Sequence, residues 1–262
     1  MRTGRTSCAA YIRSSLGHVE KSRVASDECR VKIAIIGNGR MGKAIAALGS
    51  QRGHSIHTVV DSSDNAGGRA LTRERLAGAD VAVEFTRGDA AVPNIEKVIG
   101  LNIPIVTGTT GWFSELPRLT ALVEARGGAL LHAANFSVGV HLFLRTAREL
   151  ARSYSGRPEF TAAIREEHHA TKLDAPSGTA LRLQHQLRAS DAQRSFPITS
   201  VREGTVAGTH TLTYESPHET VTLSHVARDR QPFAAGALLA AEWLPGRKGV
   251  FTFDDLLFGD TA

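Results

Sequence analysis

The chain has 262 residues, 42% of them hydrophobic and 22% charged, which is typical of a globular protein with one large α/β domain or two smaller ones. No apolar run approaches the roughly 20 residues that cross a bilayer, so the sequence excludes a membrane protein. Of the net charge of +5, the first 30 residues supply +3, and no basic stripe with interleaved aromatic residues follows. We therefore expect no nucleic-acid partner.

Residues 1–30 differ in composition from the rest of the chain. They are rich in Ser, Thr and Arg, lack a hydrophobic stretch, and contain both cysteines, Cys8 and Cys29. Because no other cysteine follows, the sequence argues against a disulfide framework and favours a reducing compartment, the cytoplasm. Either a transit peptide or a disordered extension from a misassigned upstream start codon fits this segment. Its three acidic residues favour the extension.

The folded pattern begins at residues 31–36, a short β-branched strand followed by a glycine-rich turn and a helical pattern. Gly37, Gly39 and Gly42 fit the spacing G-x-G-x-x-G. In this motif the first glycine permits the turn, the second lets the backbone approach a pyrophosphate, and the third lets the helix pack against the strand. Glycine-rich turns also serve simple strand-to-helix packing. The motif alone therefore leaves both interpretations open.

A second strand, residues 55–61, ends on Asp61 at the distance that dinucleotide-binding folds place an acidic residue. There a carboxylate can accept hydrogen bonds from both ribose hydroxyls, although a turn residue at a strand end is the alternative. Ser62 and Ser63 follow instead of an arginine, which argues against strict use of NADPH.

Strands then alternate with helices, with strands at 81–86, 104–110 and 129–136 and helices around 89–99 and 114–126. This alternation predicts an α/β fold, a Rossmann-type doubly wound parallel sheet that binds ligands at the carboxyl ends of its strands. The residues expected at that edge, above the cofactor, are Phe85, Thr86, Arg87, Gly108, Thr109, Thr110, Ala134, Asn135 and Phe136. The alternative is that they are ordinary loop residues.

The pattern changes after residue 136. One helix is followed by strands without intervening helices, and a helical pattern returns only at 234–244; the strands lie near 159–167, 197–201, 208–215 and 219–227. We expect residues 136–234 to form a second, α+β domain for substrate binding and oligomerisation. Residues 31–135 and 235–262 are expected to form the dinucleotide-binding domain.

The second domain holds the densest polar cluster of the chain: Glu166, Glu167, His168, His169, Lys172, Asp174, Ser177 and Thr179. A strand leads through a loop into a helix that starts near Ser177. Ser177, Gly178 and Thr179 would then present backbone N–H groups and hydroxyls at the positive end of the helix, which suits a carboxylate. Lys172 adds an ammonium group, so the cluster is suited to a dianionic small molecule.

The two adjacent histidines point to opposite faces if the strand persists, so one of them can face a cleft. Histidine is suited to donate a proton near neutral pH, and Lys172 is a second candidate acid. Adjacent histidines without cysteine or H-x-x-x-H spacing fit zinc poorly, so we expect no metal. Asp174 fits a turn residue better than a functional one.

Several segments together resemble the dihydrodipicolinate reductase family, also called 4-hydroxy-tetrahydrodipicolinate reductases. They are GNGRMG, VEFT, VTGTTGW, HAANFSVGV, EEHHATKLDAPSGTA and FAAGALLAAEWL, spread from about residue 31 to 258. The resemblance implies an oxidoreductase of lysine and diaminopimelate biosynthesis that uses NADH or NADPH. It also implies a homotetramer assembled through the sheet of the second domain.

Carried over by position, His168 matches the family's proton donor and Lys172 its catalytic partner and carboxylate ligand. His169, Ser177, Gly178 and Thr179 match substrate positions. The matching cofactor positions are Gly37, Arg40, Met41, Gly42, Asp61, Gly108, Thr109, Thr110 and residues 134–136.

The chain departs from the family pattern at two places. It is shorter between the helix after Ser177 and the strands after residue 197, which puts the tetramer contacts in doubt. It also lacks the Arg that often follows the acidic residue, which favours NADH and leaves the use of both cofactors open. Two other functions fit parts of the sequence: another two-domain amino-acid dehydrogenase, and an inactive nucleotide-binding sensor.

Overall fold

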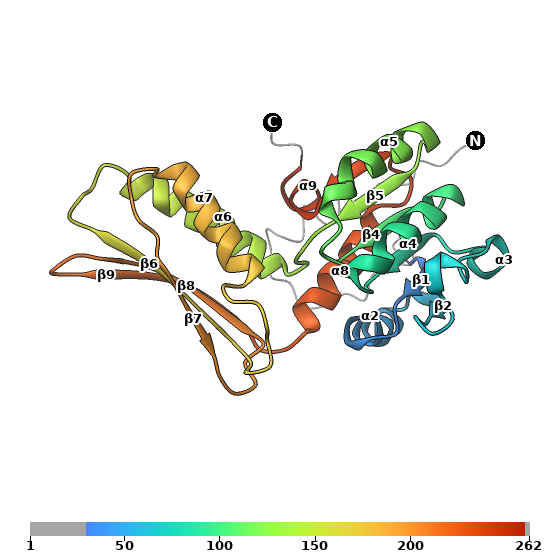
Figure 1. Ribbon diagram of the computed structural model, residues 1–262, viewed down its shortest axis with the longest axis horizontal. Helices are drawn as coiled ribbons and strands as arrows, with labels where there is room; N and C mark the ends of the chain where they lie inside the picture. The colour runs from blue at the N-terminus through green and yellow to red at the C-terminus, as the bar shows by residue number, and fades with distance from the viewer. Residues whose placement is uncertain (1–29, 260–262) are drawn as a thin grey trace. The chain divides into compact units, whose positions relative to one another are not determined.

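The computed structural model describes residues 30–259, and these form two compact units (Figure 1). The first unit extends to Phe136 and resumes at Ala234, and the second comprises Ser137–Phe233. The expected extension at residues 1–30 therefore lies, except for Arg30, outside the described residues. Among residues 30–259, no helix combines the length and the apolar character that crossing a bilayer takes.

The first unit is built on a six-stranded parallel sheet in the order β10-β5-β4-β3-β1-β2. Its strands are β1 (Lys32–Ile36), β2 (Ser55–Val60), β3 (Val81–Glu84), β4 (Ile105–Thr107), β5 (Ala129–His132) and β10 (Gly249–Thr252). The chain runs from β1 outward to β2 and then crosses to β3 on the other side of β1, so the topological switch point lies between β1 and β3. The predicted doubly wound sheet is confirmed, and β10 is an additional strand that the sequence pattern missed.

Helices cover both faces of this sheet. On one face lie α2 (Arg40–Gln51) and α8 (Gln231–Trp243), where Gly49 lies against the side chains of Ile33 and Leu238. On the other face α4 (Gly88–Gly100) and α5 (Leu116–Arg126) bury an apolar cluster with the strands. Shorter elements complete the unit: η2 (Ala66–Gly68), α3 (Arg73–Leu76), η3 (Phe113–Glu115) and α9 (Phe253–Phe258).

The second unit is a four-stranded mixed sheet in the order β7-β6-β8-β9, with two helices on one face (Figure 1). The strands are β6 (Thr161–His168), β7 (Ile198–Arg202), β8 (Gly208–Glu215) and β9 (Thr220–Ala227), and the helices are α6 (Val138–Tyr154) and α7 (Gly178–Ser190). Strand β6 pairs parallel with β7 and antiparallel with β8, which in turn pairs antiparallel with β9. The predicted α+β architecture is confirmed.

Strand β6 shows how the sequence positions polar groups inside this unit. Its burial alternates, and the inward positions are first apolar, at Ala162 and Ile164, and then polar, at Glu166 and His168. The apolar half packs against residues of α6, α7 and β8 in one core cluster. The polar half lies beside the start of α7, so the carboxyl end of β6 brings buried ionisable groups to a helix N-terminus.

Candidate active site

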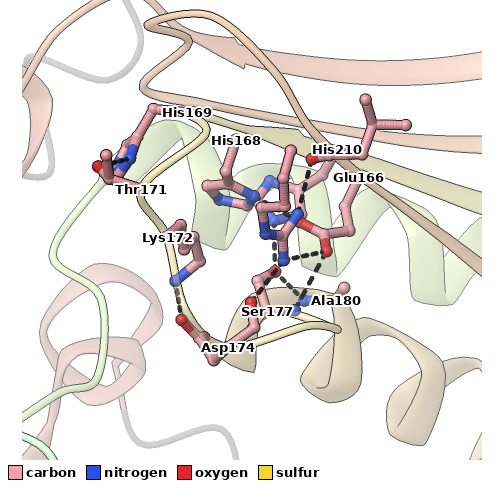
Figure 2. Close-up of polar contacts among 11 residues, drawn as sticks. Glu166, His168, His169, Thr171, Lys172, Asp174, Ser177, Ala180 and His210 are labelled. Carbon is pink, nitrogen blue, oxygen red and sulfur yellow. Dashed lines mark hydrogen bonds and ion pairs between the residues drawn. The ribbon is translucent and has the colours of Figure 1, made fainter.

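Glu166 is the centre of a buried polar network at the end of β6 (Figure 2). Its carboxylate is fully buried, and Oε2 contacts Nδ1 of His168. Oε1 accepts hydrogen bonds from the guanidinium of Arg202 on β7 at 2.7 Å and from the backbone N–H of Ser177 at 3.3 Å. Burial alone would raise the pKa of Glu166, but the hydrogen bonds from Arg202 and Ser200 and the neighbouring positive charges lower it to about 2. The carboxylate is therefore ionised at neutral pH.

His168, the last residue of β6, is 8% exposed. Burial lowers the pKa of its imidazole; Glu166 opposes this shift, while Lys172 and Arg202 add to it. Gly208 on β8 lies next to the far edge of the ring, because a Cβ there would lie 3.0 Å from Nε2. A glycine at this position therefore places no side chain against Nε2. Once protonated, this imidazole is a stronger acid than an exposed histidine.

His169 turns away from this network, as the alternation along the strand predicts. It is half-buried, its Nδ1 lies 2.8 Å from Oγ1 of Thr171, and its backbone N–H donates to the carbonyl of Val206 at 2.8 Å. The two adjacent histidines therefore have different surroundings and cannot perform the same task.

Lys172 lies in the loop between β6 and α7 and forms an ion pair with Asp174, with Nζ 2.6 Å from Oδ1 (Figure 2). The hydrogen bond from Lys172 is the main reason that the pKa of Asp174 lies below its usual range. Asp174, which the sequence favoured as a turn residue, thus holds the lysine in place. An ammonium has three donors, so Nζ can bind a second carboxylate without releasing Asp174.

Ser177 is the N-cap of the 13-residue helix α7, and its Oγ accepts from the backbone N–H of Ala180 at 3.2 Å. The backbone N–H of Ser177 is donated inward to Glu166 and is not directed to a ligand. Gly178 and Thr179 form the first turn of the helix. Their position at the positive end of the helix dipole suits an anion, as the sequence indicated.

His210 on β8 belongs to this network but was missed at the level of sequence. It pairs in register with Glu166, is 4% exposed, and places Nε2 at 3.2 Å from Oγ of Ser177. Burial, followed by the charge of His168, lowers the pKa of His210 to about 4. The alternation along β8 could have predicted that His210 is buried, because it lies two and four residues before the buried Leu212 and Tyr214 and so shares their face of the strand.

Glu166, His168 and His210 each offer a ligand atom, and these atoms lie within 4.8 Å of one another, a geometry that a metal ion can use. However, Arg202 already forms an ion pair with the same carboxylate, at 2.7 Å. A positive guanidinium on the only carboxylate of this trio opposes the binding of a second cation. The geometry alone would allow a metal ion, but the charge of Arg202 argues against one at this trio.

In the first unit, the glycine-rich loop has the close contacts that its spacing predicts. Gly37 has a positive φ of 107°, and a Cβ there would lie 2.2 Å from the carbonyl oxygen of Phe85. A Cβ on Gly42 would lie 1.9 Å from the carbonyl oxygen of Gly37, whereas one on Gly39 meets nothing within 4 Å. Gly39 is the N-cap of α2, and Arg40 and Met41 begin the helix. The loop is thus closed toward the protein and open at Gly39, where a phosphate can approach the helix N-terminus.

Asp61 follows β2 and lies near this loop, since the backbone N–H of Gly37 donates to the carbonyl of Val60 at 2.9 Å. The backbone N–H of Ser63 donates to Asp61 Oδ1 at 3.0 Å. This bond, followed by one from the Asn38 side chain, holds the pKa of Asp61 below its usual range. Asp61 therefore presents an ionised acceptor beside the glycine-rich loop.

Glu84, at the end of β3, ties together the ends of β3 and β4. Its fully buried carboxylate accepts hydrogen bonds from the hydroxyls of Thr86, Thr107 and Thr109. Thr109 Oγ1 in turn accepts from the backbone N–H of Thr86 at 2.8 Å. One carboxylate thus fixes two of the strand ends that the sequence placed at the cofactor edge.

The remaining predicted cofactor residues divide into two groups. Gly108 lies against Phe85, because a Cβ there would lie 2.1 Å from the ring, and the rings of Phe85 and Phe136 are 5.7 Å apart. Ala134 and Asn135 immediately precede Phe136. Arg87 has an 83% exposed side chain that pairs with Asp89, and Thr110 is exposed. Gly108, Phe85 and Phe136 therefore lie close together, whereas Arg87 and Thr110 lie at the surface.

Comparison with known proteins gives one consistent family. A family model described as "Dihydrodipicolinate reductase, N-terminus" matches residues 31–136, and its counterpart, "Dihydrodipicolinate reductase, C-terminus", matches residues 139–257. The chain is 36% identical over 238 residues to a 4-hydroxy-tetrahydrodipicolinate reductase of Christiangramia forsetii, covering 87% of this chain and 98% of that protein. It is 34% identical to one of Myxococcus xanthus, covering 90% and 91%.

Among solved structures, the fold is similar to that of a dipicolinate-bound dihydrodipicolinate reductase from Paenisporosarcina sp. TG-14. The TM-score is 0.67 at 22% identity, covering 85% of this chain and 97% of that chain. GenD2 from gentamicin A biosynthesis, in complex with NAD, has a TM-score of 0.57 at 18% identity, covering 92% and 93%. At these identities the structural comparison speaks for the fold alone.

Proposed function

The chain belongs to the dihydrodipicolinate reductase family, and we propose that the cluster at the end of β6 binds and protonates its substrate. As a member of this family the protein is an oxidoreductase that reduces 4-hydroxy-tetrahydrodipicolinate with NADH or NADPH in lysine and diaminopimelate biosynthesis. Another amino-acid dehydrogenase or an inactive sensor is not favoured, because the family models match both units of the chain.

The glycine-rich loop of the first unit fits a dinucleotide. The steric closure at Gly37 and Gly42 leaves the backbone near Gly39 as the accessible surface for a pyrophosphate. Asp61 would accept hydrogen bonds from the ribose hydroxyls, and the serines that follow it offer no positive charge for a 2′-phosphate. We therefore infer a preference for NADH, with NADPH as a second donor. When bound, the nicotinamide supplies a hydride to the substrate ring.

The start of α7 supports binding of a dicarboxylate. Gly178 and Thr179 lie in the first turn of the helix, and Lys172 brings an ammonium with spare donors to the same loop. His169, the half-buried neighbour of His168, is a further candidate contact. The helix start and the lysine are two separate sites for an anion. A small ring with two carboxylates fits them, with one carboxylate at the helix start and the other at Lys172.

His168 is the proposed proton donor, and Lys172 is the second candidate. Reduction of the conjugated ring at C4, with loss of water from the 4-hydroxy form, leaves an enamine that needs one proton. The contact with Glu166 occupies Nδ1 of His168, so the proton leaves from Nε2, against which Gly208 places no side chain. The observation that carries this assignment is that the short loop between β6 and α7 brings His168, Lys172 and the N-terminus of α7 close together.

We also propose a homotetramer that works in the cytoplasm. In the described second unit the helices lie on one face of the sheet, and side chains of the other face are exposed, such as Val226 at 59%. A broad sheet face of this kind is suited to packing against a second copy. Light scattering on the purified protein should then give the mass of four chains, and a monomer would refute the assembly.

A coupled assay tests the function. Dihydrodipicolinate synthase, pyruvate and aspartate semialdehyde generate the substrate, and the oxidation of NADH and of NADPH is followed separately. We expect His168→Gln to lower kcat by about 10²- to 10⁴-fold, the usual contribution of general acid catalysis, with a smaller effect on KM. Lys172→Gln should raise KM as well as lower kcat. No oxidation with either cofactor would defeat the proposed function, and a normal kcat for His168→Gln would remove His168 from its role.

A further inference from the structure

We propose that Glu166 and His210 are positioning residues that divide the active site between them: Glu166 orients His168, and His210 orients the hydroxyl of Ser177. The inference deepens the proposed function, because it rests on His168 as proton donor and on the start of α7 as the carboxylate site. Both residues act through another side chain, and the structure gives each a separate contact for this purpose.

The contact between Glu166 and His168 determines which ring nitrogen carries the hydrogen. An ionised carboxylate can only accept, so the hydrogen between Glu166 Oε2 and the ring is on Nδ1 of His168. This leaves Nε2 as the atom that gains and loses the catalytic proton, and it fixes the plane of the ring. Arg202 on the other oxygen of Glu166 compensates part of the cost of burying the carboxylate.

His210 plays the matching part for Ser177. Its Nδ1 is buried and has no hydrogen-bond partner among the described residues, whereas Nε2 lies 3.2 Å from Oγ of Ser177. Buried N–H groups without an acceptor are rare, so the hydrogen belongs on Nε2, which then donates to Ser177. Oγ of Ser177 already accepts from the N–H of Ala180. With both lone pairs engaged, the hydroxyl hydrogen can only point away from both donors, toward a ligand at the start of α7.

His168 lies among charged groups of both signs. The titratable and charged side chains that face it or its neighbours are Glu166 on β6, Arg202 on β7, His210 on β8, His225 on β9, and Lys172 and Asp174 in the loop before α7. Glu166 is the carboxylate that directly contacts His168. Removing its charge takes away the one neighbour that raises the pKa of His168, while Arg202 and Lys172 still lower it, so protonation then requires a lower pH.

Three variants of the full-length protein, measured by steady-state kinetics against pH and by dipicolinate binding, test the division of roles. Glu166→Gln should lower kcat about 10- to 100-fold, as loss of an orienting carboxylate does at other sites, with KM nearly unchanged and the alkaline limb of the kcat profile, where the proton donor loses its proton, shifted to lower pH. His210→Asn, which keeps a polar atom only near Nδ1, should raise KM and the Kd for dipicolinate about tenfold, with kcat nearly unchanged. His210→Gln, which keeps an N–H near the position of Nε2, should recover most of this loss.

A merely structural role predicts a different result. Thermal unfolding of each variant shows whether it folds, and Glu166→Asp, which keeps the charge, replaces Glu166→Gln if that variant does not. For Glu166→Asp the alkaline limb should stay in place while kcat falls. The proposal is overturned if kcat and KM change together in both residues' variants, or if His210→Gln and His210→Asn behave alike. If His168→Gln is inactive while Glu166→Gln is normal, only the positioning role fails; if His168→Gln is itself normal, the proposed function fails.

Discussion

Replacing Gly42 by alanine tests whether the third glycine of the loop serves packing or cofactor binding. The new Cβ would lie 1.9 Å from the carbonyl oxygen of Gly37 and 3.0 Å from its carbonyl carbon. Both are backbone atoms of the loop, and Gly37 itself is held against the carbonyl of Phe85. The overlap can therefore be relieved only by moving the loop or the start of α2.

The expected loss of stability follows from two opposing terms. Overpacking of this kind costs roughly 1–3 kcal/mol, occasionally more. Alanine in place of glycine inside a helix returns about 0.5–1 kcal/mol. Because the overlap is with backbone, the upper part of the first range applies, and for Gly42→Ala we expect a net loss of about 1–2.5 kcal/mol in the free energy of unfolding, together with weaker cofactor binding because the loop has moved.

Gly39→Ala is the matched control, since a Cβ there meets no atom within 4 Å and Gly39 has a φ of −77°, which alanine adopts without strain. Urea unfolding and titration with NADH measure the two effects separately. Gly39→Ala should keep its stability and yet bind NADH more weakly, because its methyl group would occupy the surface that the phosphates approach. Equal stability of Gly42→Ala and the parent protein would refute the steric argument.

Two further predictions concern the second unit. The hydroxyl of Tyr214 is buried without a hydrogen-bond partner among the described residues, so Tyr214→Phe should leave stability unchanged or raise it by up to about 1 kcal/mol in urea unfolding; a clear loss would reveal a partner. Burial lowers the pKa of His210 from 6.5 to about 4, so between these values the unfolded chain binds more protons and stability falls as the pH drops. The contribution of His210 is fully present above pH 6.5, and its loss by pH 4 amounts to roughly 3 kcal/mol. Urea unfolding at several pH values should show a smaller fall for His210→Gln, and identical pH dependence would contradict the shift.

Some features of the fold could be predicted because they depend on neighbours in the chain. Helix α6 is the helix expected directly after residue 136; it follows from a local apolar period, and the hydroxyl of Ser137 caps it by accepting from the N–H of Val140. Strand β10 was missed because its four residues have no clear alternation and pair with β5, more than a hundred residues earlier. Short strands of this kind are defined by their sheet partner.

The sequence by itself determined the glycine-rich loop and the motif from Glu166 to Thr179, because turns, caps and strand parity act over a few residues. The tertiary structure decided the partners. Arg202 and His210 reach Glu166 from strands that lie 36 and 44 positions along the chain, brought there by the register of β6 with β7 and β8. Burial, hydrogen-bond partners and neighbouring charge then set the pKa of each group, and these depend on contacts across the sheet that no local pattern encodes.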